Sequence, residues 1–273
     1  MPYRHAHWWI LGLVPFIALA FWPSYLSILS TSPPSFHLHG ITASLWLTLL
    51  AVQSWSIHHG HREFHKTSGL ISLALFPIFL AGGATIFVGM AQRYVAAFSP
   101  FHAIWPPNLA FLDFVAVGGM AYFYYQALKY RHFVGKHSSW LLATAIFLLP
   151  PIFGRIAPIP LGLDMTNPES FAQMGPSFHY GNLVSALIAF AIAASDRRNS
   201  RPWVIAGLLT IAGSLLFEVP GGTDAWKAIY IHAADIPVLP MALAAALGGM
   251  AVGWAGWVAG KKPTAPTPGA LPA

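Results

Sequence analysis

The stretch HREFHKTSGLISLALFPIFLAGGATIFVGMA, residues 61–91, decides the fold. Its second part, residues 68–91, carries no charged side chain and is long enough to cross a bilayer core about 30 Å thick, which takes about 20 helical residues. Its first part places His61 and His65 beside Arg62 and Lys66, where the apolar run begins. The stretch predicts a membrane helix with histidines at one end, and the same pattern recurs along the chain.

The composition of the whole chain is typical of a multi-pass membrane protein. Of its 273 residues, 56% are hydrophobic and 8% are charged, whereas soluble domains carry about 25% charged residues. The first apolar run, residues 8–29, is too long for a signal-peptide core of about 7 to 15 residues and is expected to stay in the membrane. The absence of cysteine excludes disulfides, thiolate metal sites and covalent haem attachment.

Windows of bilayer length predict eight membrane helices in one domain, residues 1–260, so the expected fold is an all-α polytopic bundle in the lipid bilayer. Eleven of the 14 Lys and Arg residues fall in alternate loops, which by the positive-inside rule places both termini in the cytoplasm of a bacterial inner membrane. Because these residues are scattered singly, nucleic acid is not an expected partner. The Pro-rich tail, residues 261–273, is expected to be disordered. The predicted helices cover residues 8–29, 38–58, 68–91, 108–128, 138–157, 178–195, 203–219 and 237–259.

This orientation divides the histidines between two levels, and the cytoplasmic level offers a haem site. His65 opens the third predicted helix beside Lys66, and His137 opens the fifth beside Lys136. If these helices face each other, the two imidazoles supply both axial ligands of a b-type haem and the lysines neutralise its propionates. Gly69, one turn beyond His65, is expected to let a flat porphyrin approach the helix. Alternatively, these basic loops simply hold the helix ends at anionic headgroups.

The outer level adds charged groups inside the predicted helices. Asp113 lies one turn inside the fourth helix, Arg155 closes the fifth and Glu218 closes the seventh. Because an unpaired charge at membrane depth is costly, we expect these side chains to face the bundle interior and to pair. The plainest form of this expectation is a structural ion pair between Asp113 and Arg155.

Histidines at the outer level allow two kinds of cofactor site. His39 with His179, or with His102 or His232, could ligate a second haem, with Arg155 on its propionates. Alternatively, the outer imidazoles and carboxylates could bind a divalent Zn, Fe or Mn ion, since mixed ligands of this kind suit these metals. The candidate iron or metal ligands across both levels are His39, His65, His137, His179, His232, Asp113, Glu218 and Asp235.

Several of these residues follow the order of a known family. The chain carries, in sequence order, His37-Leu-His39-Gly40, His65-Lys66-x-x-Gly69, His137-x-x-Trp140 and Arg155. Over residues 36–157 it resembles a bacterial family of multi-pass membrane proteins of unknown function, the domain of unknown function 2306 type. It departs from the family pattern by having lysine for arginine at position 66 and by lacking a basic residue directly after His137.

The helix layout is also similar to that of di-haem cytochromes b of the b-561 type. That resemblance implies one bis-histidine haem near each face, and His65 with His137 fits the inner one. It would place the partner of His39 on the fourth predicted helix, which has Asp113 and no histidine.

Together, residues and resemblance predict an integral membrane protein that binds haem b and transfers electrons, with a redox partner or a larger membrane complex. Three other functions stay open: a metal-dependent membrane enzyme using the outer His, Asp and Glu residues, a proton-coupled transporter or sensor, and a cofactor-free subunit of a larger complex. In the last helix, Gly249-x-x-x-Gly253 and Gly256-x-x-x-Gly260 predict close packing within the protein rather than a dimer seam.

Overall fold

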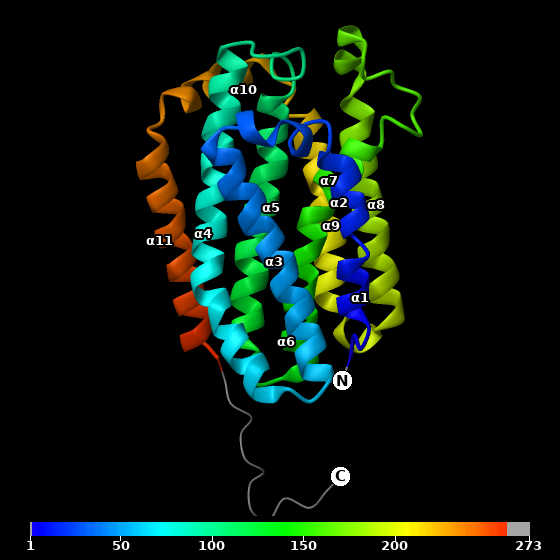
Figure 1. Ribbon diagram of the computed structural model, residues 1–273, viewed down its shortest axis with the longest axis vertical. Coiled ribbons are helices and arrows are strands. Elements are labelled where there is room, and N and C mark those ends of the chain that lie inside the picture. The colour runs from blue at the N-terminus through cyan, green and yellow to red at the C-terminus, as the bar shows by residue number, and fades with distance from the viewer. Residues whose placement is uncertain (1, 261–273) are drawn as a thin grey trace, which may run out of the picture.

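The computed structural model describes residues 2–260, which are helical with short connections (Figure 1). Residues 2–260 contain no β-strand, which confirms the all-α class, and the predicted disordered tail lies outside this range. The α-helices are α1 (Ala6–Leu11), α2 (Val14–Phe21), α3 (Pro34–His58), α4 (Arg62–Val95), α5 (Pro106–Lys129), α6 (Val134–Ala143), α7 (Leu149–Ile156), α8 (Gly175–Ser195), α9 (Ser200–Glu218), α10 (Asp224–Tyr230) and α11 (Val238–Val258). The 3-10 helices are η1 (Leu26–Thr31), η2 (Thr144–Leu148), η3 (Pro168–Gln173), η4 (Arg197–Asn199) and η5 (Ile231–Asp235).

Six helical segments between residues 2 and 260 are long and apolar enough to cross a membrane. They are α3, α4, α8 and α11, the unit of α6, η2 and α7 over Val134–Ile156, and α9 with the turn before it. The chain is therefore a membrane protein by the length and composition of its helices. Two of the eight runs predicted from the sequence do not meet this standard.

The first exception is the run 8–29. α1 ends at Leu11, and α2 covers only Val14–Phe21 before the chain turns into η1. Pro15 stands in the first turn of α2 and Pro23 follows its end. Since proline cannot donate the N–H bond that a continuous helix needs, the run breaks into two short helices. The prediction of one long helix here was wrong.

The second exception is α5, which has the length of a membrane helix but is less hydrophobic. It carries Asp113, Gln126 and tyrosines at positions 122, 124 and 125, which lower its mean hydropathy. It nevertheless lies inside the bundle, packed against α4, α6, α9 and α11 (Figure 1). Its polar residues therefore lie among other helices as well as beside lipid.

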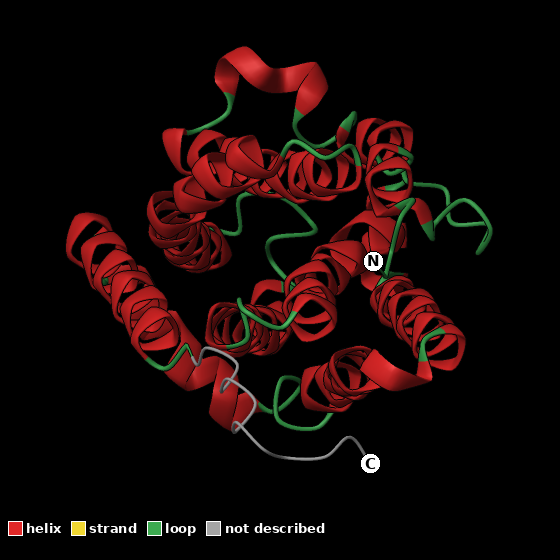
Figure 2. Cartoon of the chain, turned by 90° about the horizontal axis from the view of Figure 1, so that it is seen from below, coloured by secondary structure: helices red, strands yellow, loops and turns green. Residues whose placement is uncertain are grey.

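The long helices run up and down the bundle in alternation (Figure 1). We call the end where α3 ends and α4 begins the lower end, and the end where α4 ends and α5 begins the upper end. α1 begins and α11 ends at the lower end, while α10 and η5 lie across the upper end. Seen along the bundle, the helices stand around a central region (Figure 2).

α11 packs against α4 and α5 through its glycines. A Cβ added to Gly249 would lie 2.7 Å from the Cα of Pro77, and one added to Gly256 would lie 2.8 Å from the carbonyl oxygen of Tyr125. Only glycine lets two backbones approach this closely. The predicted internal role of these glycines is confirmed.

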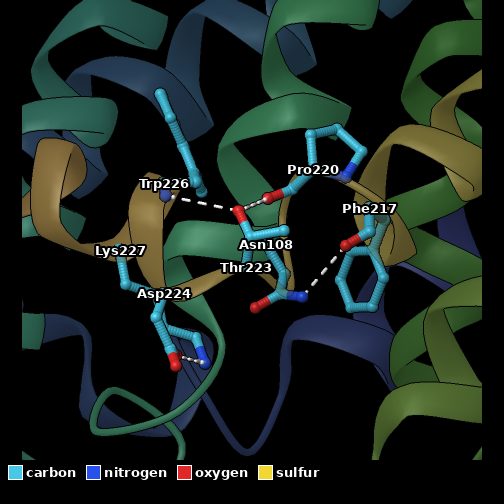
Figure 3. A network of polar contacts seen from close by, with 7 residues as sticks. All are labelled: Asn108, Phe217, Pro220, Thr223, Asp224, Trp226 and Lys227. Atoms are coloured by element: carbon cyan, nitrogen blue, oxygen red, sulfur yellow. Dashed lines mark hydrogen bonds and ion pairs between the residues drawn. The ribbon is translucent and has the colours of Figure 1, made fainter.

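A polar network ties the upper end of α5 to the α9–α10 connection (Figure 3). The Nδ2 of buried Asn108 donates to the carbonyl oxygen of Phe217 at 3.0 Å. The indole Nε1 of Trp226 donates to the carbonyl oxygen of Pro107 at 2.7 Å. Thr223 caps α10, its Oγ1 accepting from the backbone N–H of Trp226 at 3.3 Å. These bonds fix the first turns of α5, just above Asp113.

Candidate functional site

The interior face of α5 is marked by its helical spacing. Met120 and Tyr124 are buried in the aromatic core. Asp113 lies seven residues before Met120, and Val117 lies seven residues before Tyr124, so all four stand on one face of the helix. Asp113 therefore stands on the helical face that carries these two buried residues, and its own side chain keeps exposed surface.

α3 presents His39 to the same interior. His39 lies seven residues, or two turns, before Trp46, which is fully buried in the centre of the bundle. Its ring stacks on Phe79 of α4, with the centroids 5.9 Å apart and an interplanar angle of 21°. Neither ring nitrogen has a hydrogen-bond partner within residues 2–260, and Nδ1 is shielded from solvent. An imidazole without a partner at this depth is a candidate ligand-binding group.

Arg155, in the last turn of α7, lies at the same level. Its Nη1 donates to the carbonyl oxygen of Pro151 at 2.9 Å, and its guanidinium lies 4.4 Å above the ring of Phe21 in α2. It is within electrostatic range of both His39 and Asp113. These contacts hold the guanidinium at the upper end while leaving most of its N–H donors free.

Asp113 and Arg155 both retain exposed side-chain surface, although α5 and α7 pack against neighbouring helices. On α4, a Cβ added to Gly83 would meet no atom within 4 Å.

Asp113 and Arg155 attract each other without direct contact. Each lies in the electrostatic field of the other, but the described residues include no Asp113–Arg155 ion pair within 4.0 Å. The expected structural ion pair was therefore wrong. Asp113 also acts on Tyr230 of α10, whose pKa is raised by burial and further by the Asp113 carboxylate.

The lower end contains the predicted histidine pair. His65, in the first turn of α4, has its Nδ1 3.2 Å from the carbonyl oxygen of Gln53 in α3. His137, in α6, has its Nδ1 2.8 Å from the carbonyl oxygen of Ala127 in α5. The two imidazoles are within electrostatic range of each other. Each ring is thus held by a neighbouring helix through Nδ1.

These bonds fix the tautomer of both rings. A carbonyl oxygen accepts only from a protonated Nδ1, so Nε2 carries the lone pair in the neutral ring. Within residues 2–260 the Nε2 of neither ring has a hydrogen-bond partner. α4 packs mainly on α3, α11 and η5, whereas α6 packs mainly on α5 and α9. The two histidines therefore stand on helices that are not each other's main neighbours.

Two details of the predicted haem site differ from expectation. A Cβ added to Gly69 would lie 3.2 Å from Oε1 of Gln53, so this glycine accommodates a glutamine rather than open space for a porphyrin. Gln53 in turn donates from Nε2 to Ser68 Oγ at 2.7 Å. The lysines lie on exposed contacts, Lys66 with Glu63 at 2.7 Å and Lys136 with its Nζ 5.1 Å from the ring centroid of Tyr130.

His179 and Glu218, predicted for the outer level, bind each other. The His179 Nε2 lies 2.6 Å from Glu218 Oε1, and both side chains are partly exposed. A groove of about 420 Å³ beside them is lined largely by apolar side chains, including Leu183 and Ile211. α8, which carries His179, packs mainly on α7 and α9, so the structure does not pair this histidine with His39 of α3.

The remaining outer candidates do not join these groups. His232 and Asp235 are exposed in the 3-10 helix η5. His102 lies in the loop before α5, with its Nδ1 2.7 Å from Ser99 Oγ. Among residues 2–260, no three His, Asp or Glu side chains are grouped so that they could hold a metal ion. The proposed outer metal cluster is therefore not assembled.

An aromatic column separates the two polar levels. The ring of Phe79, on which His39 stacks, lies 6.2 Å from that of Trp46, and Trp46 lies 5.5 Å from Tyr124. Phe76 lies 4.3 Å from Tyr124, whose hydroxyl is 2.8 Å from Ser72 Oγ. The Trp46 Nε1 donates to Thr144 Oγ1 at 3.0 Å. Sequence reasoning missed this column, although the seven-residue spacing of His39 and Trp46 could have indicated it.

Comparison of the chain with known protein families, with curated proteins and with solved structures found no match.

Proposed function

We propose that this protein is an inner-membrane haem b protein that transfers electrons, with His65 and His137 as axial ligands. One observation carries the proposal: both imidazoles are anchored at Nδ1 by a main-chain carbonyl of an adjacent helix, and neither Nε2 has a hydrogen-bond partner among residues 2–260. Histidines that bind iron or other metals are held by a second-shell hydrogen bond of this kind. The two rings also lie within electrostatic range of each other, which supports their binding to one haem.

The chain's own residues perform three tasks in this proposal. The carbonyl groups of Gln53 and Ala127 fix the ring orientation and the tautomer. The axial ligands and the polarity of their surroundings set the reduction potential of a bound haem. The exposed Lys66 and Lys136 lie next to the ligands in sequence and are free to turn toward propionate groups. Haem supplies the capacity to carry one electron at a time.

The proposal includes eight membrane crossings with both termini in the cytoplasm. The arrangement of α5 inside the bundle and the common lower end of α1 and α11 support an even number of crossings. The excess of Lys and Arg in alternate loops supports the orientation. Because the chain has no cysteine, single cysteines can report topology directly. With a thiol reagent that does not cross the membrane, Lys129→Cys should react only after the membrane is made permeable. Lys227→Cys should react with the same reagent in intact cells.

A visible spectrum of the purified protein tests the haem assignment. Protein made with ample haem should show a Soret band that sharpens and shifts on reduction with dithionite. His65→Ala and His137→Ala should remove this spectrum, whereas the matched control His59→Ala should keep it, since His59 bonds only to the carbonyl of Trp55 in its own helix. A colourless wild-type protein, or unchanged spectra in both ligand variants, would contradict the proposal.

A further inference from the structure

We propose that a pocket at the upper end of the bundle, between the start of α3 and the end of α4, binds a phosphate group. The pocket has a volume of about 210 Å³, and its lining includes Ser35, Phe36, Gly89, Gln92 and Arg93. The observation that carries the proposal is Arg93, which lines this pocket and has no hydrogen-bond or ion-pair partner for its side chain among residues 2–260. The pocket lies at the opposite end of the bundle from His65 and His137 (Figure 1), so it is a site beyond the proposed haem function.

Two aromatic rings hold the Arg93 side chain at the pocket. Its Cζ lies 4.9 Å from the ring centroid of Phe36 in α3 and 4.2 Å from that of Phe98 in the loop after α4. Such cation–π contacts position a guanidinium, but they use none of its five N–H donors as hydrogen bonds to an oxygen. The donors therefore stay available to a ligand that carries several acceptor oxygens.

The charge of the pocket favours an anion. Within the described part of the chain, Arg93 is the one charged residue in the pocket lining, and no carboxylate lies within 4.0 Å of its nitrogens. The guanidinium fork fits the oxygens of a phosphate or a carboxylate. The positive-inside rule does not account for this arginine, because the proposed orientation turns the upper end away from the cytoplasm.

A second donor favours phosphate over carboxylate. Ser35, in the first turn of α3, lies beside Gly89 of α4, since a Cβ added to Gly89 would be 3.6 Å from Ser35 Oγ. A hydroxyl can donate to an anion. A tetrahedral phosphate presents oxygens to Ser35 and Arg93 at once, whereas a planar carboxylate directs both of its oxygens to the guanidinium fork. The volume of about 210 Å³ is below the roughly 300 to 1,000 Å³ of pockets for drug-sized ligands, so it suits a small group.

Two sources can supply this phosphate group. α3 and α4 are both long and apolar enough to cross a membrane, and the pocket lies where one begins and the other ends. This is the level at which lipid headgroups meet water. The bound group is therefore the phosphate of a phospholipid headgroup or a soluble phosphate at the membrane surface, and the experiment below separates these two.

Binding is measured on the full-length protein in dodecyl maltoside, a detergent without phosphate. The probes are inorganic phosphate and dihexanoyl phosphatidic acid, and thermal unfolding midpoints at constant ionic strength give the apparent affinity for each. Arg93→Gln should weaken binding about tenfold or more, because it removes charge-assisted hydrogen bonds. Ser35→Ala, which removes one neutral donor, should weaken it about threefold. The matched control Lys227→Gln removes a positive charge at the same end of the bundle and should bind as the wild type does.

Gly89→Leu tests the pocket without changing any charge. The Cβ has room at 3.6 Å from Ser35 Oγ, and the rest of the side chain would fill the space that the ligand needs. We expect this variant to keep the helical circular dichroism spectrum and to lose the stabilisation by the probe. If Arg93→Gln does not fold, Gly89→Leu and Ser35→Ala still test the proposal.

The two probes identify the source of the phosphate. Stabilisation by dihexanoyl phosphatidic acid that inorganic phosphate does not reproduce assigns the pocket to a lipid headgroup, whereas stabilisation by both assigns it to a soluble phosphate. Failure of both probes to stabilise the wild type would overturn the proposal. So would equal stabilisation by dihexanoylglycerol, which has the same chains and no phosphate, or by acetate, which has a carboxylate instead. Unchanged affinity in Arg93→Gln and Gly89→Leu would place the bound phosphate outside this pocket and would also overturn it.

Discussion

Asp113 of α5 and Arg155 of α7 attract each other across the interior of the bundle without forming a direct ion pair. Rigid neighbours hold them apart: the Asn108 bond to Phe217 fixes the start of α5, and Arg155 is bound to Pro151 and lies over Phe21. The two charges therefore act on each other through the field and not through a direct contact.

The separation predicts a measurable coupling. Asp113→Asn leaves the charge of Arg155 uncompensated, and Arg155→Gln does the same to Asp113, so each should destabilise the protein. The double variant should lose less than the sum of the single losses, with a coupling energy of about 1 kcal/mol. Unfolding in mixed detergent micelles, followed by circular dichroism, measures the loss of stability in the two single variants and in the double variant. Strictly additive losses would show that the two charges do not interact.

The sequence predicted a charged partner for Asp113 because an unpaired charge at membrane depth is costly. It could not predict that Arg155 stays out of contact, since that depends on the packing of α2 against α7, which brings Phe21 beneath the guanidinium. The pairing of His179 with Glu218 was equally hidden. Both residues were assigned to one outer level by topology, which gives depth but not the face of the helix.

The lower histidines were predicted more completely. His65 and His137 follow from their positions at the ends of apolar runs, and the structure places them within electrostatic range. The supporting carbonyls of Gln53 and Ala127 could not be predicted, because main-chain acceptors leave no mark in the sequence. The break at 8–29 could have been predicted from Gly12, Pro15 and Pro23, which punctuate the run.

His102 predicts a pH dependence of stability. Burial, together with the nearby positive charge of Arg93, lowers its pKa from the usual 6.5 to about 4. Between these values the unfolded chain binds more protons than the folded protein, so His102 contributes a loss of stability as pH falls below 6.5. Substitution by Gln should reduce the slope of the unfolding midpoint between pH 7 and about 4.5. An unchanged slope would show that His102 is protonated equally in both states.

Glu218→Gln should have little effect. The His179–Glu218 pair is partly exposed, and such pairs contribute about 0 to 1 kcal/mol. We expect a loss of unfolding free energy of at most about 1 kcal/mol, with the haem spectrum unchanged. Loss of the haem spectrum would return these two residues to the functional site and support the metal or second-haem interpretation of the outer level.

The glycines of α11 allow a matched pair of substitutions. A Cβ at Gly249 would lie 2.7 Å from the Cα of Pro77, whereas one at Gly248 would meet nothing within 4 Å. Gly249→Ala should therefore push α11 away from α4 and destabilise the protein by about 1 to 3 kcal/mol, as overpacking does. Gly248→Ala should be neutral or slightly stabilising, since alanine favours the helix. Equal effects would mean that α11 does not pack on α4 in this register.

Replacement of His137 by glycine separates a ligand from a structural role. The His137 ring bonds only to the Ala127 carbonyl among the described residues, so His137→Gly should leave a space of imidazole shape beside that acceptor. Free imidazole can occupy the space, keep the bond to Ala127 and offer its second nitrogen as a ligand. Millimolar imidazole should restore the reduced haem spectrum of His137→Gly, whereas the same addition to His59→Gly, which keeps both ligands, should change nothing. Stabilisation of His137→Gly by imidazole without return of the spectrum would assign this histidine to packing alone.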